Sequence, residues 1–160
     1  MLWKRALQMT EDNHISQRIV SLSPSNTEIL FAVGAGDKVV GTTDYCNYPS
    51  ELDTRIETED ITKVGGYWNP SVKTIISLEP DLVVVSTAKC TVKTNNCKTN
   101  CSHRCEQTII VANELKNLGL NVLTLAPHSL DDVMDNILLV GKSTGNSPQA
   151  LALVENLKKR

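Results

Sequence analysis

Four of the five cysteines lie close together in one polar stretch of the chain, where they could bind a metal. They are separated by six, three and three residues, and the set consists of Cys90, Cys97, Cys101 and Cys105. Thiolate sulfur is a ligand for zinc and for iron–sulfur clusters, and the lysine and arginine residues nearby would offset its negative charge. His103 adds a nitrogen that could serve as a further ligand.

The spacing of these cysteines matches neither the paired CxxC motifs of common zinc sites nor the ferredoxin pattern. Three interpretations therefore stay open: a zinc or iron–sulfur site, two disulfides that hold a segment with little core of its own, and free thiols. Cys46 follows a different predicted strand, and it could join the four if both segments meet at one edge of a sheet.

Aromatic residues are few and unevenly placed. The chain has two tryptophans, three tyrosines and one phenylalanine, and four of these lie in two short loop-like stretches, namely Tyr45, Tyr48, Tyr67 and Trp68. Flat apolar rings offer a large contact area and lose little rotamer entropy on binding. They therefore suit a flat, largely apolar ligand.

Predicted strands alternate with predicted helices. The strand segments are 18–22, 39–42, 82–86 and 121–125, and the helical segments are 25–33, 69–78, 106–118, 129–142 and 147–160. This alternation predicts an α/β fold with a parallel sheet and helices on both faces. Ligands of such sheets bind beyond the carboxyl ends of the strands, and these loops are residues 23–26, 43–49, 86–105 and 126–129.

Local signals set the expected helix boundaries. Ser25 and Glu28 have capping-box spacing, and Asn69 followed by Pro70 is typical of a helix start. Residues 43–62 are expected to be mainly loop. The glycines expected to close helices are Gly34 and Gly119. The last helix has an apolar stripe that could contact a second copy of the chain, formed by Leu151, Leu153, Val154 and Leu157.

Four segments, in order, resemble one known family. They are RIVSLSPSNTEILFAVG, VVGTTDYCNYP, VGGYWNPSVKTIISLEPDLVVV and LGLNVLTL, and together they cover most of residues 18–125. The sequence is similar to the N-terminal lobe of the cobalamin, haem and iron–siderophore substrate-binding proteins of ABC transporters. In that family a long helix leaves this lobe and leads to a second lobe, and the ligand is held between the two.

The resemblance implies three segments in the chain. Residues 1–17 are an N-terminal extension, residues 18–146 are the α/β lobe with a cysteine-rich insertion at 87–105, and residues 147–160 are the start of the backbone helix. A length of 160 residues is ordinary for one domain.

The resemblance also implies ligand-binding residues. The family's ligand contacts fall on three positions of the first loop and on two aromatic stretches. In this sequence the matching residues are Ser23, Pro24, Ser25, Tyr45, Tyr67 and Trp68. Free backbone N–H groups at the start of the first helix would meet a polar group of the ligand. Two interpretations stay open for Tyr48, which could contact ligand or pack the turn before Pro49.

One position departs from the family's pattern. Many members carry a glutamate in the helix before the EPDLV strand, where it pairs with an arginine of the ABC permease, but the matching residue here is Lys73. A lysine would repel that arginine. The alternatives are an alignment shifted by a residue or two and an ordinary solvated side chain.

The residues and the resemblance together predict a protein that binds a metal chelate, which would be cobalamin, haem or an iron–siderophore. It would act in an ABC importer or as a stand-alone derivative of one. No Ser–His–acid arrangement and no phosphate-binding loop is visible, so enzyme activity is not expected. The alternative is a zinc or iron–sulfur redox protein that works through the cysteine-rich insertion, with a homodimer rebuilding the two-lobed cleft.

Composition constrains partners and location. The formal charge of −2 does not favour binding to nucleic acid, and no apolar run approaches the roughly 18 residues of a membrane helix. Lys4 and Arg5 are not followed by the apolar segment of a signal peptide. The family is extracytoplasmic, so cytoplasmic and exported locations both stay open.

Overall fold

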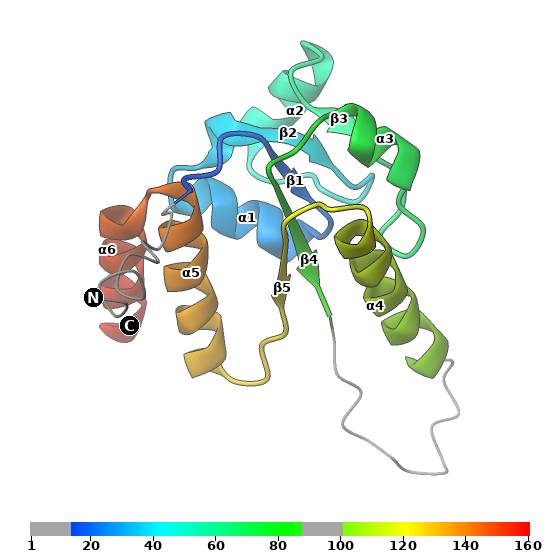
Figure 1. Ribbon diagram of the computed structural model, residues 1–160. Helices are drawn as coiled ribbons and strands as arrows, with labels where there is room; N and C mark the ends of the chain where they lie inside the picture. Colours follow the sequence, from blue (N-terminus) through cyan, green and yellow to red (C-terminus); the bar gives the residue numbers. More distant parts are fainter. Residues whose placement is uncertain (1–13, 88–100) are drawn as a thin grey trace, which may run out of the picture.

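The chain forms a five-stranded sheet in which all strands run parallel. The computed structural model describes residues 14–87 and 101–160, with the backbone alone for residues 101–106. The strands follow the order β3-β2-β1-β4-β5 (Figure 1). Their bounds are β1 Ile19–Ser21, β2 Val39–Thr42, β3 Thr62–Lys63, β4 Leu82–Ser86 and β5 Val122–Leu125. The predicted parallel α/β sheet is confirmed.

Helices cover both faces of this sheet, as predicted. Their bounds are α1 Pro24–Ala32, α2 Ser50–Glu57, α3 Val72–Ser77, α4 Cys101–Asn117, α5 Leu130–Thr144 and α6 Ser147–Lys158, and a short 3₁₀ helix spans Gly36–Lys38. Residues of α1, α2, α5 and α6 pack into one buried cluster, whereas α3 and α4 contribute to another. The two clusters lie on opposite sides of the strands because successive side chains of a strand point to opposite faces.

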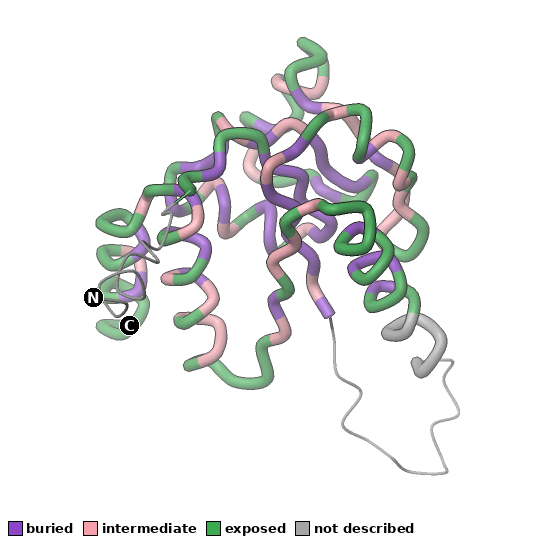
Figure 2. Tube along the Cα trace, in the orientation of Figure 1, coloured by how far each residue is buried: buried purple, intermediate pink, exposed green. Residues whose placement is uncertain are grey.

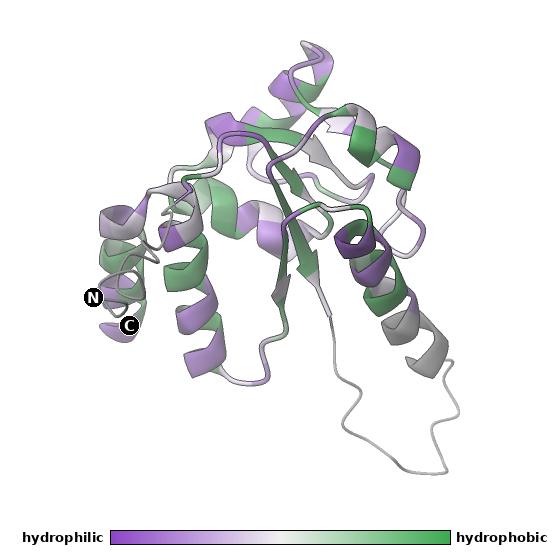
Figure 3. Ribbon diagram, viewed as in Figure 1, coloured by the Kyte–Doolittle hydropathy of each residue, from purple (hydrophilic) through white to green (hydrophobic). Residues whose placement is uncertain are grey.

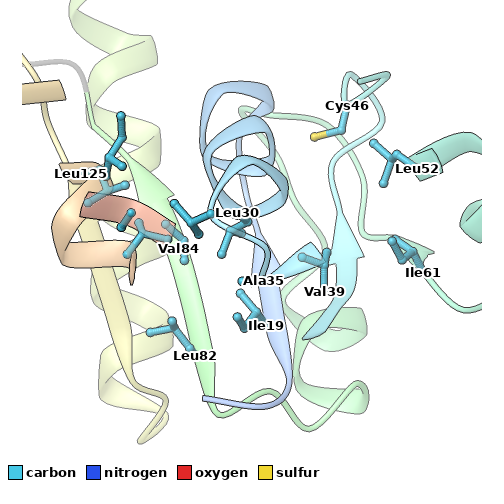
Figure 4. Close-up of a cluster of buried hydrophobic side chains, with 14 of the residues drawn as sticks. Ile19, Leu30, Ala35, Val39, Cys46, Leu52, Ile61, Leu82, Val84 and Leu125 are labelled. Atoms are coloured by element: carbon cyan, nitrogen blue, oxygen red, sulfur yellow. The ribbon is translucent and has the colours of Figure 1, made fainter. Parts of the chain in front are cut away.

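Strands β1 and β4 form the centre of the molecule. Ile19 and Val84 belong to the first cluster, and their neighbours Val20 and Val83 belong to the second. All four residues are fully buried. These two strands are accordingly mostly buried in Figure 2 and strongly hydrophobic in Figure 3. Figure 4 shows side chains from β1, α1, β2 and β4 meeting in the first cluster.

Two helix starts differ from those predicted. Ser23, rather than Ser25, caps α1, because its side chain accepts the Asn26 N–H and Pro24 occupies the first helical turn. Ser71, rather than Asn69, caps α3 by accepting the Thr74 N–H. In both cases a serine three residues before a free backbone N–H provides the better cap geometry.

The stretch expected to be mainly loop contains α2 and β3. α2 fully buries only Leu52, and Ile56 one turn later is partly buried, so this short helix offers a single i, i+4 apolar pair to indicate it. Arg55 holds it against the strand edge by donating hydrogen bonds to the carbonyl groups of Gly36, Asp37 and Val39. This helix therefore depends on a tertiary contact.

The helix after the cysteine-rich stretch starts earlier than predicted. α4 begins at Cys101 rather than at Glu106, so the backbone positions of Cys101 and Cys105 lie in its first turns. Cys90 and Cys97 lie outside the described residues. Gly34 and Gly119 follow α1 and α4 with φ of 81° and 85°, as expected for residues that close helices. Within the described ranges, no helix is both long and apolar enough to cross a membrane.

The last two helices pack closely against each other. A Cβ atom on Gly141 of α5 would lie 2.4 Å from the Cβ of Ala150 on α6. Ala150 and Val154 are buried, whereas Leu151 and Leu157 are 53% and 39% exposed. The predicted apolar stripe of α6 is therefore split, because Val154 faces the core of the same chain.

Replacing Gly141 by valine is expected to destabilise the protein by about 2 kcal/mol, because the added methyl groups would push α6 away from α5. Urea unfolding followed by circular dichroism measures the change. Lys142→Val is the matched control, since Lys142 is the next residue and is exposed. Equal unfolding midpoints for the two variants would contradict the close packing.

Asp132 in the first turn of α5 gives the fold a pH-dependent contribution. The backbone N–H of His128 donates to Asp132 Oδ2 at 2.8 Å, and Ser129 Oγ accepts the Asp132 N–H at 3.1 Å. The hydrogen bond that the carboxylate accepts from the His128 N–H is the main cause that lowers the pKa of Asp132 below its ordinary value of 3.8, and interaction of the carboxylate with the Ser129 side chain lowers it further. Because its pKa is lowered on folding, the carboxylate stabilises the protein above that ordinary value, and this contribution is lost as the pH falls through the lowered pKa.

We expect Asp132→Asn to be less stable than the wild type at neutral pH and to approach it in stability in acid. Urea titrations at a series of pH values measure both curves. Asp131→Asn, in the same helical turn, controls for the change in net charge. A stability difference that stays constant across the whole pH series would show that the carboxylate is not responsible.

Candidate functional site

Four of the predicted ligand-binding residues line one hollow at the edge of the sheet. Its volume is about 340 Å³, it is open to solvent, and it is lined by Pro24, Tyr45, Tyr67 and Trp68. Pro24 follows β1, Tyr45 follows β2, and the other two follow β3. We refer to these four residues as the aromatic pocket. Loops from three parallel strands meet here because the carboxyl ends of parallel strands share an edge.

Tyr45 lies on a tight turn whose flanking residues are buried. Tyr45 is 64% exposed, whereas Thr43 and Cys46 are 0% and 2% exposed. The Asp44 N–H donates to the Gly65 carbonyl at 2.9 Å, and the Cys46 N–H donates to the Thr43 carbonyl at 3.2 Å. The turn therefore presents one ring outward from a fixed base.

Tyr67 and Trp68 lie on the neighbouring turn. Their ring centroids are 4.4 Å apart and the planes are nearly perpendicular, at 87°. The Tyr67 hydroxyl donates to the Ser86 carbonyl at 3.4 Å, which connects this turn to the end of β4. Edge-to-face packing of this kind orients both rings before any ligand binds.

Glycine lets the two aromatic turns approach each other. A Cβ atom on Gly66 would lie 2.4 Å from Asn69 Oδ1 and 4.0 Å from Tyr45 Cε2. A larger residue at this position would displace the Asn69 side chain and would come into van der Waals contact with the Tyr45 ring. Gly66 thus leaves room for Asn69 between the two turns.

The serines of the first loop have different positions. Ser23 is 2% exposed, and its hydroxyl caps α1 and lies 3.2 Å from the hydroxyl of Ser25. Ser25 is exposed beside the pocket-lining Pro24. Ser23 therefore has a structural role at the helix start, and direct contact of Ser23 or Ser25 with ligand stays a prediction.

Tyr48 lines a different hollow. This second hollow, of about 220 Å³, is lined by Glu28, Phe31, Ala32, Tyr48, Pro49 and Glu51. Of the two interpretations for Tyr48, the geometry favours packing beside Pro49 over contact with a ligand in the aromatic pocket.

Cys46 is a buried core thiol. Its sulfur lies 3.2 Å from Thr27 Oγ1 and 3.3 Å from Thr43 Oγ1, and it packs in the first hydrophobic cluster (Figure 4). Among the residues that the structure describes, no group of three or more His, Cys, Asp or Glu side chains could hold a metal ion. The predicted metal site of Cys90, Cys97, Cys101 and Cys105 stays a prediction. Cys90 and Cys97 lie outside the described residues, and only the backbone of Cys101 and Cys105 is described.

Sequence reasoning did not single out Lys63, whose side chain contacts the turn that carries Tyr45. A lysine at the end of a short strand carries no pattern that would distinguish it from a solvated one. Lys73, at the position where the family carries a docking glutamate, is exposed on α3.

Comparisons with known proteins agree with this architecture. A family model described as periplasmic binding protein matches residues 19–160. An uncharacterized ABC transporter substrate-binding lipoprotein, YvrC, of Bacillus subtilis strain 168 is 35% identical over 143 residues, which make up 89% of this chain and 38% of that protein. The vitamin B12-binding protein of Vibrio parahaemolyticus is 29% identical over 129 residues, or 81% of this chain and 38% of that protein.

The fold also recurs in solved structures. A periplasmic haem-binding protein from Pseudomonas aeruginosa aligns with a TM-score of 0.68 at 20% identity, over 91% of this chain and 44% of that one. The chain thus spans less than half the length of each of these relatives.

Substrate-binding proteins of this kind bind ligands and are not enzymes, as the sequence predicts for this chain. The resemblance read from the four sequence segments is confirmed over about one lobe. The parallel sheet, the loops at its carboxyl edge and the match over residues 19–160 lead to one conclusion: the chain belongs to the periplasmic binding protein family.

Proposed function

We propose that the aromatic pocket binds a metal chelate, namely cobalamin, haem or an iron–siderophore, in an ABC importer or a derivative of one. The observation that carries the proposal is the convergence of Pro24, Tyr45, Tyr67 and Trp68 on one hollow from three separate loops. Tyr45 and Trp68 are 64% and 37% exposed. Exposed aromatic side chains that share one hollow are typical of ligand contacts rather than of core packing.

The shape of the pocket suits the edge of a large flat ligand. A hollow of about 340 Å³ lies near the lower end of the range for ligand pockets, and a corrin or porphyrin would project well beyond it. Tyr67 and Trp68, which already pack edge to face, lose little entropy when such an edge packs on them.

A second surface would have to cover the rest of the ligand, because tight sites bury most of the ligand's area. In the proposed arrangement this surface is either a further lobe, as the greater length of the relatives suggests, or a second copy of the chain. Sedimentation velocity with and without ligand separates the two, since only the second arrangement doubles the mass on binding.

The relatives support the ligand class. The protein from Vibrio parahaemolyticus is named for vitamin B12, and the structure from Pseudomonas aeruginosa is described as binding haem. Partnership with a permease rests on the transporter name of the Bacillus subtilis relative. Lys73 stands where the family carries a glutamate that pairs with a permease arginine, and a lysine would repel that arginine. Docking to a permease would therefore need other contacts.

Tyr45 and Tyr48 provide a matched pair for testing the site, because they are 64% and 62% exposed but line different hollows. We expect Tyr45→Ala to weaken binding of cyanocobalamin or haemin about tenfold or more, and Tyr48→Ala to change it by less than about twofold. Isothermal titration calorimetry measures each dissociation constant.

A second readout locates the ligand. In a Trp3→Phe background Trp68 is the remaining tryptophan, and a bound corrin or porphyrin should quench its fluorescence. Equal losses of affinity in the two tyrosine variants, or binding without quenching, would place the ligand elsewhere. Absence of binding by the wild type to cyanocobalamin, haemin and a ferric hydroxamate siderophore would refute the proposed ligand class.

A further inference from the structure

Lys63 ends β3 beside the turn that carries Tyr45. Its ammonium group donates to three carbonyl groups of that turn, at 3.2 Å to Thr43, 3.4 Å to Asp44 and 2.9 Å to Cys46. An ammonium group has three N–H donors, so these contacts match its full capacity.

The three acceptors surround Tyr45 in sequence. Thr43 and Cys46 are buried at the two ends of the turn, and the exposed ring projects between them. Carbonyl dipoles that converge on one point repel one another unless a cation lies there, and hydrogen bonds from a charged donor are stronger than neutral ones. The ammonium group therefore favours the one turn conformation in which all three carbonyls face it.

The partners of Lys63 are loop carbonyls rather than a carboxylate. Across residues 14–87 and 107–160, the one ion pair is that of His14 with Asp81, at 3.8 Å. Replacing the ammonium group therefore alters the turn without breaking a salt bridge in the described part of the protein.

We infer that Lys63 is a positioning residue for the aromatic pocket: its ammonium group holds residues 43–46 so that the Tyr45 ring lines the pocket. The inference rests on the proposed function, because it assigns Lys63 an effect on ligand affinity through Tyr45. Lys63 itself does not line the pocket.

The test compares substitutions that remove or keep the cation. Lys63→Met keeps the length of the side chain and removes the donors, and it should weaken binding of cyanocobalamin or haemin about tenfold, roughly the value of one charged hydrogen bond. Lys63→Arg should recover part of this loss. Lys38→Met is the matched control, because Lys38 Nζ donates to the Thr144 carbonyl at 2.5 Å, away from the pocket.

A double-mutant cycle separates positioning from a general loss of stability. In a Tyr45→Ala background, Lys63→Met should change affinity by less than about twofold, since the ring it positions is gone. The inference is overturned if Lys63→Met binds like the wild type, if it costs as much without Tyr45 as with it, or if Lys38→Met weakens binding equally.

Amide hydrogen exchange gives a readout without ligand, which keeps the inference distinct from the proposed function. Residues 44–48 should exchange faster in Lys63→Met than in the wild type or in Lys38→Met. If the wild type binds neither cyanocobalamin nor haemin, the proposed function fails for these ligands, and faster exchange still supports the role of Lys63 in the turn. Unchanged exchange overturns it.

Discussion

The pairing of β2 with β3 determines where the aromatic side chains lie. The register matches Gly41 with Thr62 and Thr42 with Lys63. It continues past the strands, because the Val64 N–H donates to the Thr42 carbonyl and the Asp44 N–H to the Gly65 carbonyl, both at 2.9 Å. The chain segments leading to Tyr45 and to Tyr67 are therefore joined before they diverge into turns. A shift of one residue in this pairing would turn the side chains to the opposite face.

The turn that carries Tyr67 and Trp68 is also fixed on its far side. The Ser71 N–H donates to the Val64 carbonyl at 2.7 Å, immediately before α3 begins. Leu78, the residue after α3, packs on β2, since a Cβ atom on Gly41 would lie 2.8 Å from Leu78 Cδ1. A glycine in the strand thus leaves room for the side chain that ends the α3 segment, and the start of α3 sets where the aromatic turn ends. The geometry of the pocket follows from backbone contacts made several residues away from it.

The sequence predicts the elements that have an apolar run or clear helix-end signals, and it misses the shortest elements. Four strands are recognisable as short apolar runs, which is typical of strands buried on both faces, and most helices are recognisable from their end signals together with their apolar residues. α2 offers only one i, i+4 apolar pair, Leu52 and Ile56, and β3 has two residues, so both patterns are too short to stand out. Pro24 in the first turn could have shifted the predicted cap from Ser25 to Ser23. The aromatic residues of the site stand out by type and by resemblance. The contribution of Lys63 does not stand out in the sequence. Its acceptors are backbone carbonyl groups, which every residue type has, so the sequence does not show that three of them face one lysine.

Exposure alone does not distinguish the two tyrosines of the turn after β2. Tyr45 and Tyr48 are 64% and 62% exposed, yet they line different hollows. Cys46 lies between them, and its buried sulfur contacts the hydroxyls of Thr27 and Thr43. This anchor divides the segment, because the residue before it is held against the neighbouring aromatic turn, while the residues after it run on to α2. Which tyrosine lines the aromatic pocket at the sheet edge is therefore decided by its position relative to the buried cysteine, a property of packing that the spacing of the aromatic residues does not carry.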